Sequence, residues 1–386
     1  ALASVTDGTG PIASFTYVGF QPKVTTFGNG ATATYTFGGF RPQLTGIHHQ
    51  TSGSATLVRM DYGYNQVHDR TYERFGGSGS PGDAFEYDKA RRLTKAWMGS
   101  DTPASPSGNP YVQTIAYNMD DDGNRTSVVT TPYGQSPATE SYTTNNLNQY
   151  TAVGGVSQSH DANGNLTNNG TYTFKYNYRN LICEVRTSGG GTLVATYQYD
   201  ANGRRVVKAV SGGITERYVY SGVETVSVYD GSNGWKQDFV FDVTGIDRIL
   251  ALEQADVLDQ DADTNTSELT RSYYHTNALG SVMMISTASE DEAASCRYTP
   301  YGERTITVGG TPQGSDPLGQ SWGYTGRFHD AESGLTYYRA RYQCSVTGRF
   351  LERDPLGYGA SQNLYEYVSS SPLSRMDPSG LADQPS

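Results

Sequence analysis

The chain has 386 residues, among them 45 glycines and 30 tyrosines, with only 17% charged residues and a formal charge of −11. Abundant glycine and tyrosine favour many short strands joined by tight turns over long helices. The negative charge and the absence of a long basic run exclude a phosphate-backbone partner, so we expect no nucleic acid.

The cysteines do not indicate a bonded framework. Cys183, Cys296 and Cys344 are odd in number and have no CxxC spacing, so neither disulfides nor a zinc site is predicted. No run of about 18 apolar residues is present, which excludes a membrane-spanning helix. The first ten residues lack the charged and apolar regions of an intact signal peptide. An export signal on a longer precursor stays open.

Strict alternation of apolar and polar residues is the strongest local signal. It occurs at residues 31–37, 172–178 and 193–199. In the clearest case the alternating aromatic residues are Tyr172, Phe174, Tyr176 and Tyr178. This pattern predicts half-buried antiparallel strands with one aromatic face.

Similar turn sequences follow such strands. His160-Asp-Ala-Asn-Gly-Asn165 and Tyr199-Asp-Ala-Asn-Gly-Arg204 are nearly the same, and Asp120-Asp-Asp-Gly-Asn124 is a third version. Asn, Asp and Gly accept positive φ and suit hairpin turns, so we predict positive φ at Gly164 and Gly203. Asp161 and Asp200 are 39 residues apart with a degenerate turn between them, which gives about twenty residues per hairpin.

A repeat this short must stack on its neighbours to bury its aromatic face. We therefore predict a β-hairpin array over residues 1–255 and further strands and turns over 268–322. Residues 256–267 are polar and are expected to form an exposed loop, and a second interruption is expected at Gly309–Gln320.

Two motifs carry a family resemblance. Residues 199–206 read YDANGRRV, and residues 323–357 read GYTGRFHDAESGLTYYRARYQCSVTGRFLERDPLG, followed by MDPSGL at 376–381. The first resembles the YD repeat of bacterial RHS proteins, Tc toxin C subunits and teneurins. The second and third resemble the RHS-repeat-associated core, here residues 323–381.

The resemblance implies an all-β fold: a spiralling strip of YD hairpins forms a hollow or partial shell, and the associated core closes it as a C-terminal plug. Two features depart from the family pattern. Ser370 stands where the YxYxxNxP form has Asn, and only the remnant 382–386 follows Leu381. The array is also short for the family, so we expect an N-terminal portion to be missing.

The resemblance also implies a self-cleaving aspartyl site. On this chain its residues fall on Arg341, Asp354 and Asp377, and its target is the Leu381–Ala382 bond. Two carboxylates held close cannot both ionise easily, so one keeps a proton while the other acts as base. An adjacent arginine would stabilise an oxyanion.

A plainer interpretation stays open for these residues. Asp354 and Asp377 both precede prolines, as in ordinary turns, and Arg341 could simply form a surface ion pair. On this interpretation the site is vestigial. On the self-cleaving interpretation the chain is at most a single-turnover protease.

Metal and cofactor sites are not predicted. The histidines lack paired metal-ligand spacing and no glycine-rich loop precedes a helix. The Asp161–Asn165 segment starts like a calcium loop, but turn chemistry explains it. Calcium stays open only at Asp259, Asp261 and Asp263.

The leading functional hypothesis is a secreted or surface shell protein that encapsulates or presents a polypeptide, its own C-terminal extension or another chain. The alternative is a structural or adhesive extracellular protein, such as a filament or wall component, with glycan binding or self-assembly as its activity.

Overall fold

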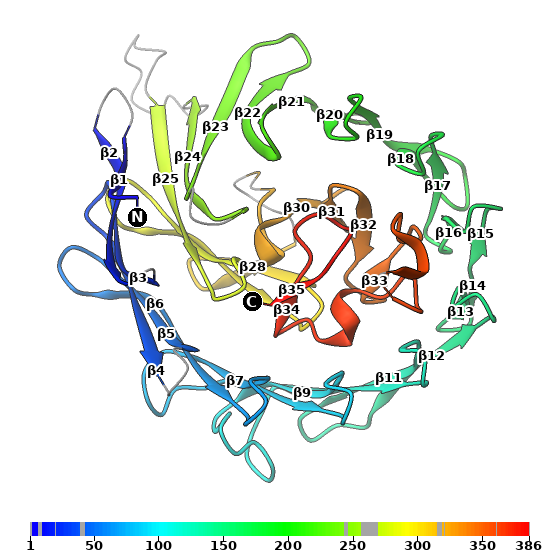
Figure 1. The fold of residues 1–386 in the computed structure, drawn as a ribbon, viewed down its shortest axis with the longest axis horizontal. Helices are drawn as coiled ribbons and strands as arrows, with labels where there is room; N and C mark the ends of the chain where they lie inside the picture. The colour runs from blue at the N-terminus through cyan, green and yellow to red at the C-terminus, as the bar shows by residue number, and fades with distance from the viewer. Residues whose placement is uncertain are drawn as a thin grey trace.

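The computed structural model describes residues 2–6, 10–19, 21–38, 43–242, 246–255, 269–314, 319, 321–359 and 361–385. Figure 1 shows two curved sheets that follow one another around a ring, with the C-terminal strands inside it. We call the two large sheets the wall, and residues 321–359 and 361–385 the C-terminal block.

The first sheet of the wall has fourteen strands. They are β1 (Ser4–Thr6), β2 (Pro11–Val18), β3 (Gln21–Phe27), β4 (Thr32–Gly38), β5 (Gln43–Gln50), β6 (Thr56–Tyr64), β7 (Arg70–Phe75), β8 (Gly82–Tyr87), β9 (Leu93–Ser100), β10 (Gln113–Met119), β11 (Arg125–Pro132), β12 (Ala138–Thr144), β13 (Tyr150–Val153) and β14 (Val156–Ser157).

The second sheet has fifteen strands. They are β15 (Ser159–His160), β16 (Leu166–Asn168), β17 (Tyr172–Tyr176), β18 (Ile182–Thr187), β19 (Leu193–Tyr199), β20 (Arg205–Val210), β21 (Thr215–Ser221), β22 (Glu224–Asp230), β23 (Trp235–Phe241), β24 (Ile249–Ala255), β25 (Leu269–Thr276), β26 (Val282–Ser286), β27 (Glu292–Tyr298), β28 (Arg304–Val308) and β29 (Thr311–Gln313).

The C-terminal block holds two small sheets and three short 3-10 turns. The sheets are β30 (Phe328–Asp330), β31 (Leu335–Tyr338), β32 (Arg341–Cys344) and β33 (Arg349–Phe350), and then β34 (Arg375–Met376) with β35 (Gln384–Pro385). The 3-10 turns are η1 (Tyr324–Gly326), η2 (Gly357–Gly359) and η3 (Val368–Ser370).

Every sheet is a simple meander. Within each sheet each strand pairs with the next strand along the chain, and the pairing is antiparallel. No α-helix is present among the described residues. The predicted all-β fold, a hairpin strip with its C-terminal segment inside, is confirmed.

The structure corrects two local predictions and does not test a third. Strand β17 ends at Tyr176, and Tyr178, which alternation placed on the aromatic face, lies in a turn with 94% of its surface exposed. The expected interruption at Gly309–Gln320 contains β29, which pairs with β28. The loop predicted at 256–267, with the calcium candidate at Asp259, lies outside the described residues.

The turns share one hydrogen-bond pattern. In the Asp200–Arg204 turn, Asp200 Oδ1 accepts from the main-chain N–H groups of Asn202 and Arg204, each at 2.9 Å. Asp161 and Asn277 bind their own turns in the same way. The Asp161 carboxylate is thus occupied by turn chemistry, as expected.

The tyrosines that precede these turns each tie two strands together. Their hydroxyls donate to a main-chain carbonyl of the preceding strand at 2.6–2.8 Å. The pairs are Tyr64–Leu44, Tyr87–Arg70, Tyr176–Leu166, Tyr199–Ile182, Tyr220–Arg205 and Tyr298–Val282. A buried hydroxyl needs such a partner, and phenylalanine could not supply the bond.

The two wall sheets meet at a seam between β5–β6 and β25–β26. Apolar side chains of both sheets pack there, with Ile47 and Met60 against Met283 and Met284. Hydrogen bonds cross the same contact: the Ala278 N–H donates to the Tyr62 hydroxyl at 3.0 Å. The seam closes the ring where the N-terminal strands meet β24 and β25 in Figure 1.

A buried histidine pair lies in the seam. His49 Nε2 contacts the Thr276 carbonyl at 3.2 Å, so this nitrogen carries a proton and His49 Nδ1 is an acceptor. His275 Nδ1 therefore donates to His49 Nδ1, at 3.0 Å, and His275 Nε2 accepts from the Ser286 hydroxyl at 2.8 Å. Burial lowers the pKa of His49 to about 4 and the pKa of His275 well below its usual range.

Ion pairs fasten the C-terminal block to the wall. Arg205 of β20 pairs with Asp330 of β30, both essentially unexposed, and Lys208 lies 3.4 Å from the same carboxylate. The Arg205 main-chain N–H donates to the Tyr337 hydroxyl at 3.0 Å. Separating one partner from such a buried pair leaves the other charge buried without a counter-charge, which is costly. These contacts therefore fix the position of the C-terminal block against the wall.

The predicted positive φ is confirmed, at 90° for Gly164 and 82° for Gly203. A β-branched side chain is strained in this region, so Gly203→Val should lower the free energy of unfolding by roughly 1 kcal/mol or more. Urea unfolding measures the change. Ala201→Val, at an exposed position of the same turn, should leave stability nearly unchanged, and equal effects of the two changes would contradict this assignment.

The histidine pair predicts acid sensitivity. An unfolded histidine titrates near pH 6.5 whereas folded His49 titrates near 4, so the unfolded state takes up protons first as the pH falls. Stability should therefore be complete above about pH 6.5 and decline towards pH 4, by up to about 3 kcal/mol from His49.

Thermal melting between about pH 7.5 and about pH 5 measures this decline. His49→Asn retains an acceptor that cannot be protonated, and should reduce the acid-dependent loss of melting temperature. His68→Asn, in an exposed turn, should behave like the unchanged protein. An undiminished acid-dependent loss in His49→Asn would refute the role of the pair.

Candidate functional site

Arg341, Asp354 and Asp377 come together inside the ring. Arg341 begins β32, Asp354 follows β33, and Asp377 follows β34. Arg341 Nη2 lies 3.1 Å from Asp354 Oδ2 and 3.4 Å from Asp377 Oδ2. One guanidinium nitrogen thus contacts both carboxylates, although the three residues come from three separate segments.

Arg341 is held on every side. Nε donates to the Gly380 carbonyl at 2.5 Å and Nη1 donates to the Leu364 carbonyl at 3.2 Å. The guanidinium carbon lies 3.7 Å from the centre of the Phe350 ring. Burial lowers the pKa of Arg341, and the two carboxylates oppose this effect. The arginine is therefore a fixed positive charge in a water-poor site, where it acts strongly on any developing negative charge.

Asp377 binds the segment that follows it. Its Oδ1 accepts from the main-chain N–H groups of Ser379, Leu381 and Ala382 at 3.2, 3.1 and 3.2 Å. The Ala382 nitrogen belongs to the peptide bond predicted to be cut. The carboxylate thus touches the nitrogen that would leave in a cleavage of that bond.

Asp354 has a different environment. Burial raises its pKa, and Asp377 adds to the rise, while Arg341 and a hydrogen bond from the Leu356 N–H oppose it. The net direction is upward, so Asp354 is the carboxyl that holds a proton more readily than an exposed aspartate. Neighbouring carboxyls in unequal environments are the arrangement required for acid–base chemistry.

Gly380 is required by the close approach of two main chains. It adopts φ of 72°, and a Cβ on it would lie 2.2 Å from the Tyr338 carbonyl oxygen. No other residue fits without moving the loop. The glycine of the MDPSGL motif therefore lets residues 377–382 lie against the β31–β32 hairpin.

Glu352 is a buried carboxyl that sequence reasoning missed. One oxygen accepts from the Tyr342 N–H at 2.9 Å, and burial raises the pKa of Glu352 to about 8. Its spacing of two from Asp354 was a visible signal, because alternate residues of an extended segment share a side.

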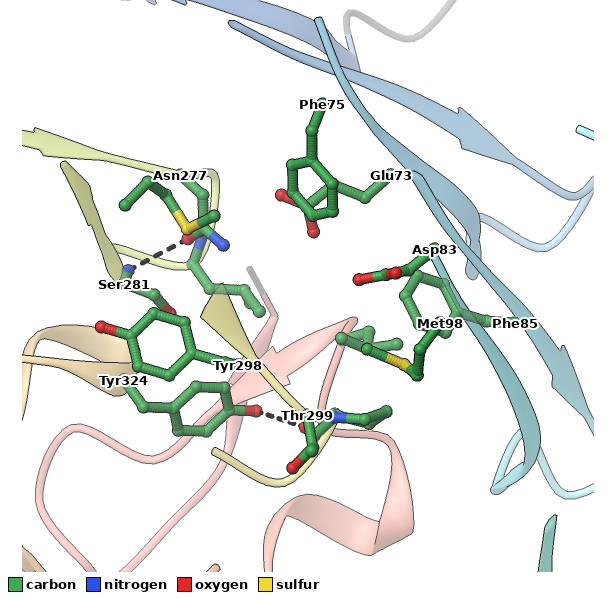
Figure 2. A pocket seen from close by; sticks show the side chains of 14 residues that line it. Glu73, Phe75, Asp83, Phe85, Met98, Asn277, Ser281, Tyr298, Thr299 and Tyr324 are labelled. Atoms are coloured by element: carbon green, nitrogen blue, oxygen red, sulfur yellow. Dashed lines mark hydrogen bonds between the residues drawn. The ribbon is translucent and has the colours of Figure 1, made fainter. Parts of the chain in front are cut away.

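A separate cavity of about 30 Å³ lies between the two wall sheets, and Tyr324 and Leu373 of the C-terminal block complete its lining. Figure 2 shows Glu73 and Asp83 of the wall across it from Tyr298 and Tyr324. Burial raises the pKa of Asp83 to about 7, and one Glu73 oxygen has no hydrogen-bond partner. Its size suits a water molecule or two.

Among the described residues, no group of three or more His, Cys, Asp or Glu side chains is placed to hold a metal ion. The same part of the chain contains no helix long and apolar enough to cross a membrane. Cys183, Cys296 and Cys344 are not joined in disulfide bonds.

The comparisons establish the family. The teneurin YD-shell family matches residues 80–370, more than half of the chain. The chain belongs to this family, which confirms the resemblance carried by its YD and associated-core motifs.

Curated relatives include proteins named as toxins and nucleases. The tRNA3(Ser)-specific nuclease WapA of Bacillus spizizenii is 32% identical over 273 residues, which are 69% of this chain and 11% of that protein. The toxin protein Tse5 of Pseudomonas aeruginosa is 30% identical over 230 residues, 52% of this chain and 16% of that protein. This chain thus spans only a small part of these relatives.

The fold matches solved structures over nearly its whole length. The Tc holotoxin pore of Photorhabdus luminescens, with a mutated TccC3, aligns with a TM-score of 0.78 and 22% identity. The alignment covers 97% of this chain and 19% of that chain. This likeness shows the shared YD-shell fold.

Proposed function

We propose that this chain is part of a shell that encloses a polypeptide, and that its C-terminal block cuts the chain once, between Leu381 and Ala382. The observation that carries the proposal is the shared contact of Arg341 with Asp354 and Asp377, beside the Ala382 nitrogen. Relatives named as a nuclease and as a toxin support an extended C-terminal polypeptide as the enclosed partner, and a secreted or surface location.

The roles follow from the contacts. Asp377 acts as the base: it takes a proton from a water molecule that attacks the Leu381 carbonyl carbon. Asp354, with its raised pKa, holds the second proton and donates a hydrogen bond to the oxyanion, which Arg341 also stabilises. Asp377 then passes its proton to the Ala382 nitrogen, 3.2 Å away, and the carbon–nitrogen bond breaks.

An intramolecular reaction needs little catalytic strength. The bond is held beside the acid–base pair at all times, which gives a high effective molarity. After the cut the same residues have no second bond to attack, so one turnover is the expected limit. The enclosed segment would thereby be freed from the shell's chain without a separate protease.

Measuring the intact mass of the protein tests for cleavage. The chain carrying a reporter domain fused after Ser386 should be cleaved after Leu381. The Asp377→Asn and Asp354→Asn variants should remain uncleaved, and their far-UV circular dichroism spectra should match that of the unchanged chain. Because protonated Asp354 is the required form, the cleavage rate should fall as the pH rises through its raised pKa.

Asp161→Asn is the matched control, because Asn177 occupies the same turn position naturally and hydrogen-bonds in the same way. It should cleave like the unchanged chain. If the unchanged chain stays whole at every pH, the self-cleavage proposal fails and the structural or adhesive alternative stands.

A further inference from the structure

Three consecutive residues of the β31–β32 hairpin bind three consecutive carbonyls before the Leu381–Ala382 bond. Arg339 Nη1 donates to the Pro378 carbonyl, the Ala340 N–H donates to the Ser379 carbonyl at 3.2 Å, and Arg341 Nε donates to the Gly380 carbonyl at 2.5 Å. Only the third of these contacts belongs to the site described above. The contacts of Arg339 and Ala340 hold the same segment at residues further from the Leu381–Ala382 bond.

Arg339 is itself fastened to the wall. Its Nη2 lies 2.6 Å from Asp247 Oδ1, and its Nε and Nη2 donate to the Val223 carbonyl at 3.2 and 3.1 Å. The guanidinium group is planar and rigid, so contacts that hold Nε and Nη2 also fix the direction of the Nη1 donor. Asp247 and Val223 thus fix the direction in which Arg339 meets Pro378.

Recognition at this point uses main-chain atoms. The three carbonyls are bound whatever the side chains, and only Gly380 is selected, by its close approach to Tyr338. Ala382, after the bond, is exposed. The three hairpin contacts therefore bind residues before the bond, and Ala382 is held through its main-chain N–H by Asp377.

We propose that Arg339, anchored by Asp247, is a positioning residue that aligns the Leu381–Ala382 peptide against Asp377. The inference rests on the proposed self-cleavage. It adds that the substrate segment is recognised through the carbonyls of Pro378, Ser379 and Gly380. Arg339 contacts Asp247, Val223 and Pro378, and not Asp354, Asp377 or the Leu381–Ala382 peptide.

The test measures the first-order cleavage rate of freshly translated chain with a reporter domain after Ser386. Arg339→Ala should slow cleavage by roughly tenfold to a hundredfold, because a small misplacement is costly, and should leave the pH profile in place. Arg341→Ala should instead move the profile, since Arg341 opposes the raised pKa of Asp354. Arg339→Lys, which keeps one donor, should recover part of the rate.

Arg186→Ala is the matched control: Arg186 also joins a carboxylate, Glu184, to a main-chain carbonyl, that of Gly191, but within β18 and its turn, where it contacts none of the residues that hold Arg339. It should cleave at the unchanged rate. A parental rate in Arg339→Ala, or a shifted pH profile, would overturn the positioning role.

Hydrogen exchange separates this inference from the proposed function. If the unchanged chain does not cleave, self-cleavage fails, and the positioning role of Arg339 is judged on the amides of Leu381 and Ala382 in the intact chain. Arg339→Ala should speed their exchange and Arg186→Ala should not. Equal exchange in all three proteins rejects the positioning role.

Discussion

A single-layer strip of hairpins has an aromatic face that must be kept from water, and this constraint shapes the whole molecule. A flat strip would leave that face exposed, and no second layer of helices covers it among the described residues. The chain meets the constraint by curving the strip and filling its centre. The largest buried cluster joins Phe174, Tyr197 and Phe239 of the wall to Trp322 and Tyr342 of the C-terminal block.

The site depends on that closure. The C-terminal block has little regular structure of its own, and the wall supplies many of its polar contacts: Arg349 donates to the Asn148 carbonyl and to Asn124, and the Tyr365 hydroxyl donates to the Gly164 carbonyl. The turns that carry the YD signature therefore have two roles. They connect the strands of the hairpins, and their atoms that face the C-terminal block hold the loops that bring Asp354 and Asp377 to Arg341.

The repeats were predictable from sequence because their signals are local. A tyrosine, an Asp or Asn, and a glycine within five residues specify both the turn and its φ. The trio of Arg341, Asp354 and Asp377 came from family resemblance, since spacing alone could not place them together. Arg339 was missed because its role depends on a tertiary contact: it meets Pro378 39 residues away, and nothing local marks that partner. Glu352 had a local signal in its spacing from Asp354, but the sequence does not show that it is buried.

Sequential pairing has a consequence for the order of assembly. Within each sheet, each strand pairs with the strand made just before it, so the hairpins can form one after another as the chain emerges. The closing contacts are different in kind: His49 and His275 are 226 residues apart, and Arg205 and Asp330 are 125 apart. They carry a loop-closure cost and must form late. We therefore expect the aspartate–arginine cluster to be completed late in folding, when the C-terminal block has docked inside the ring.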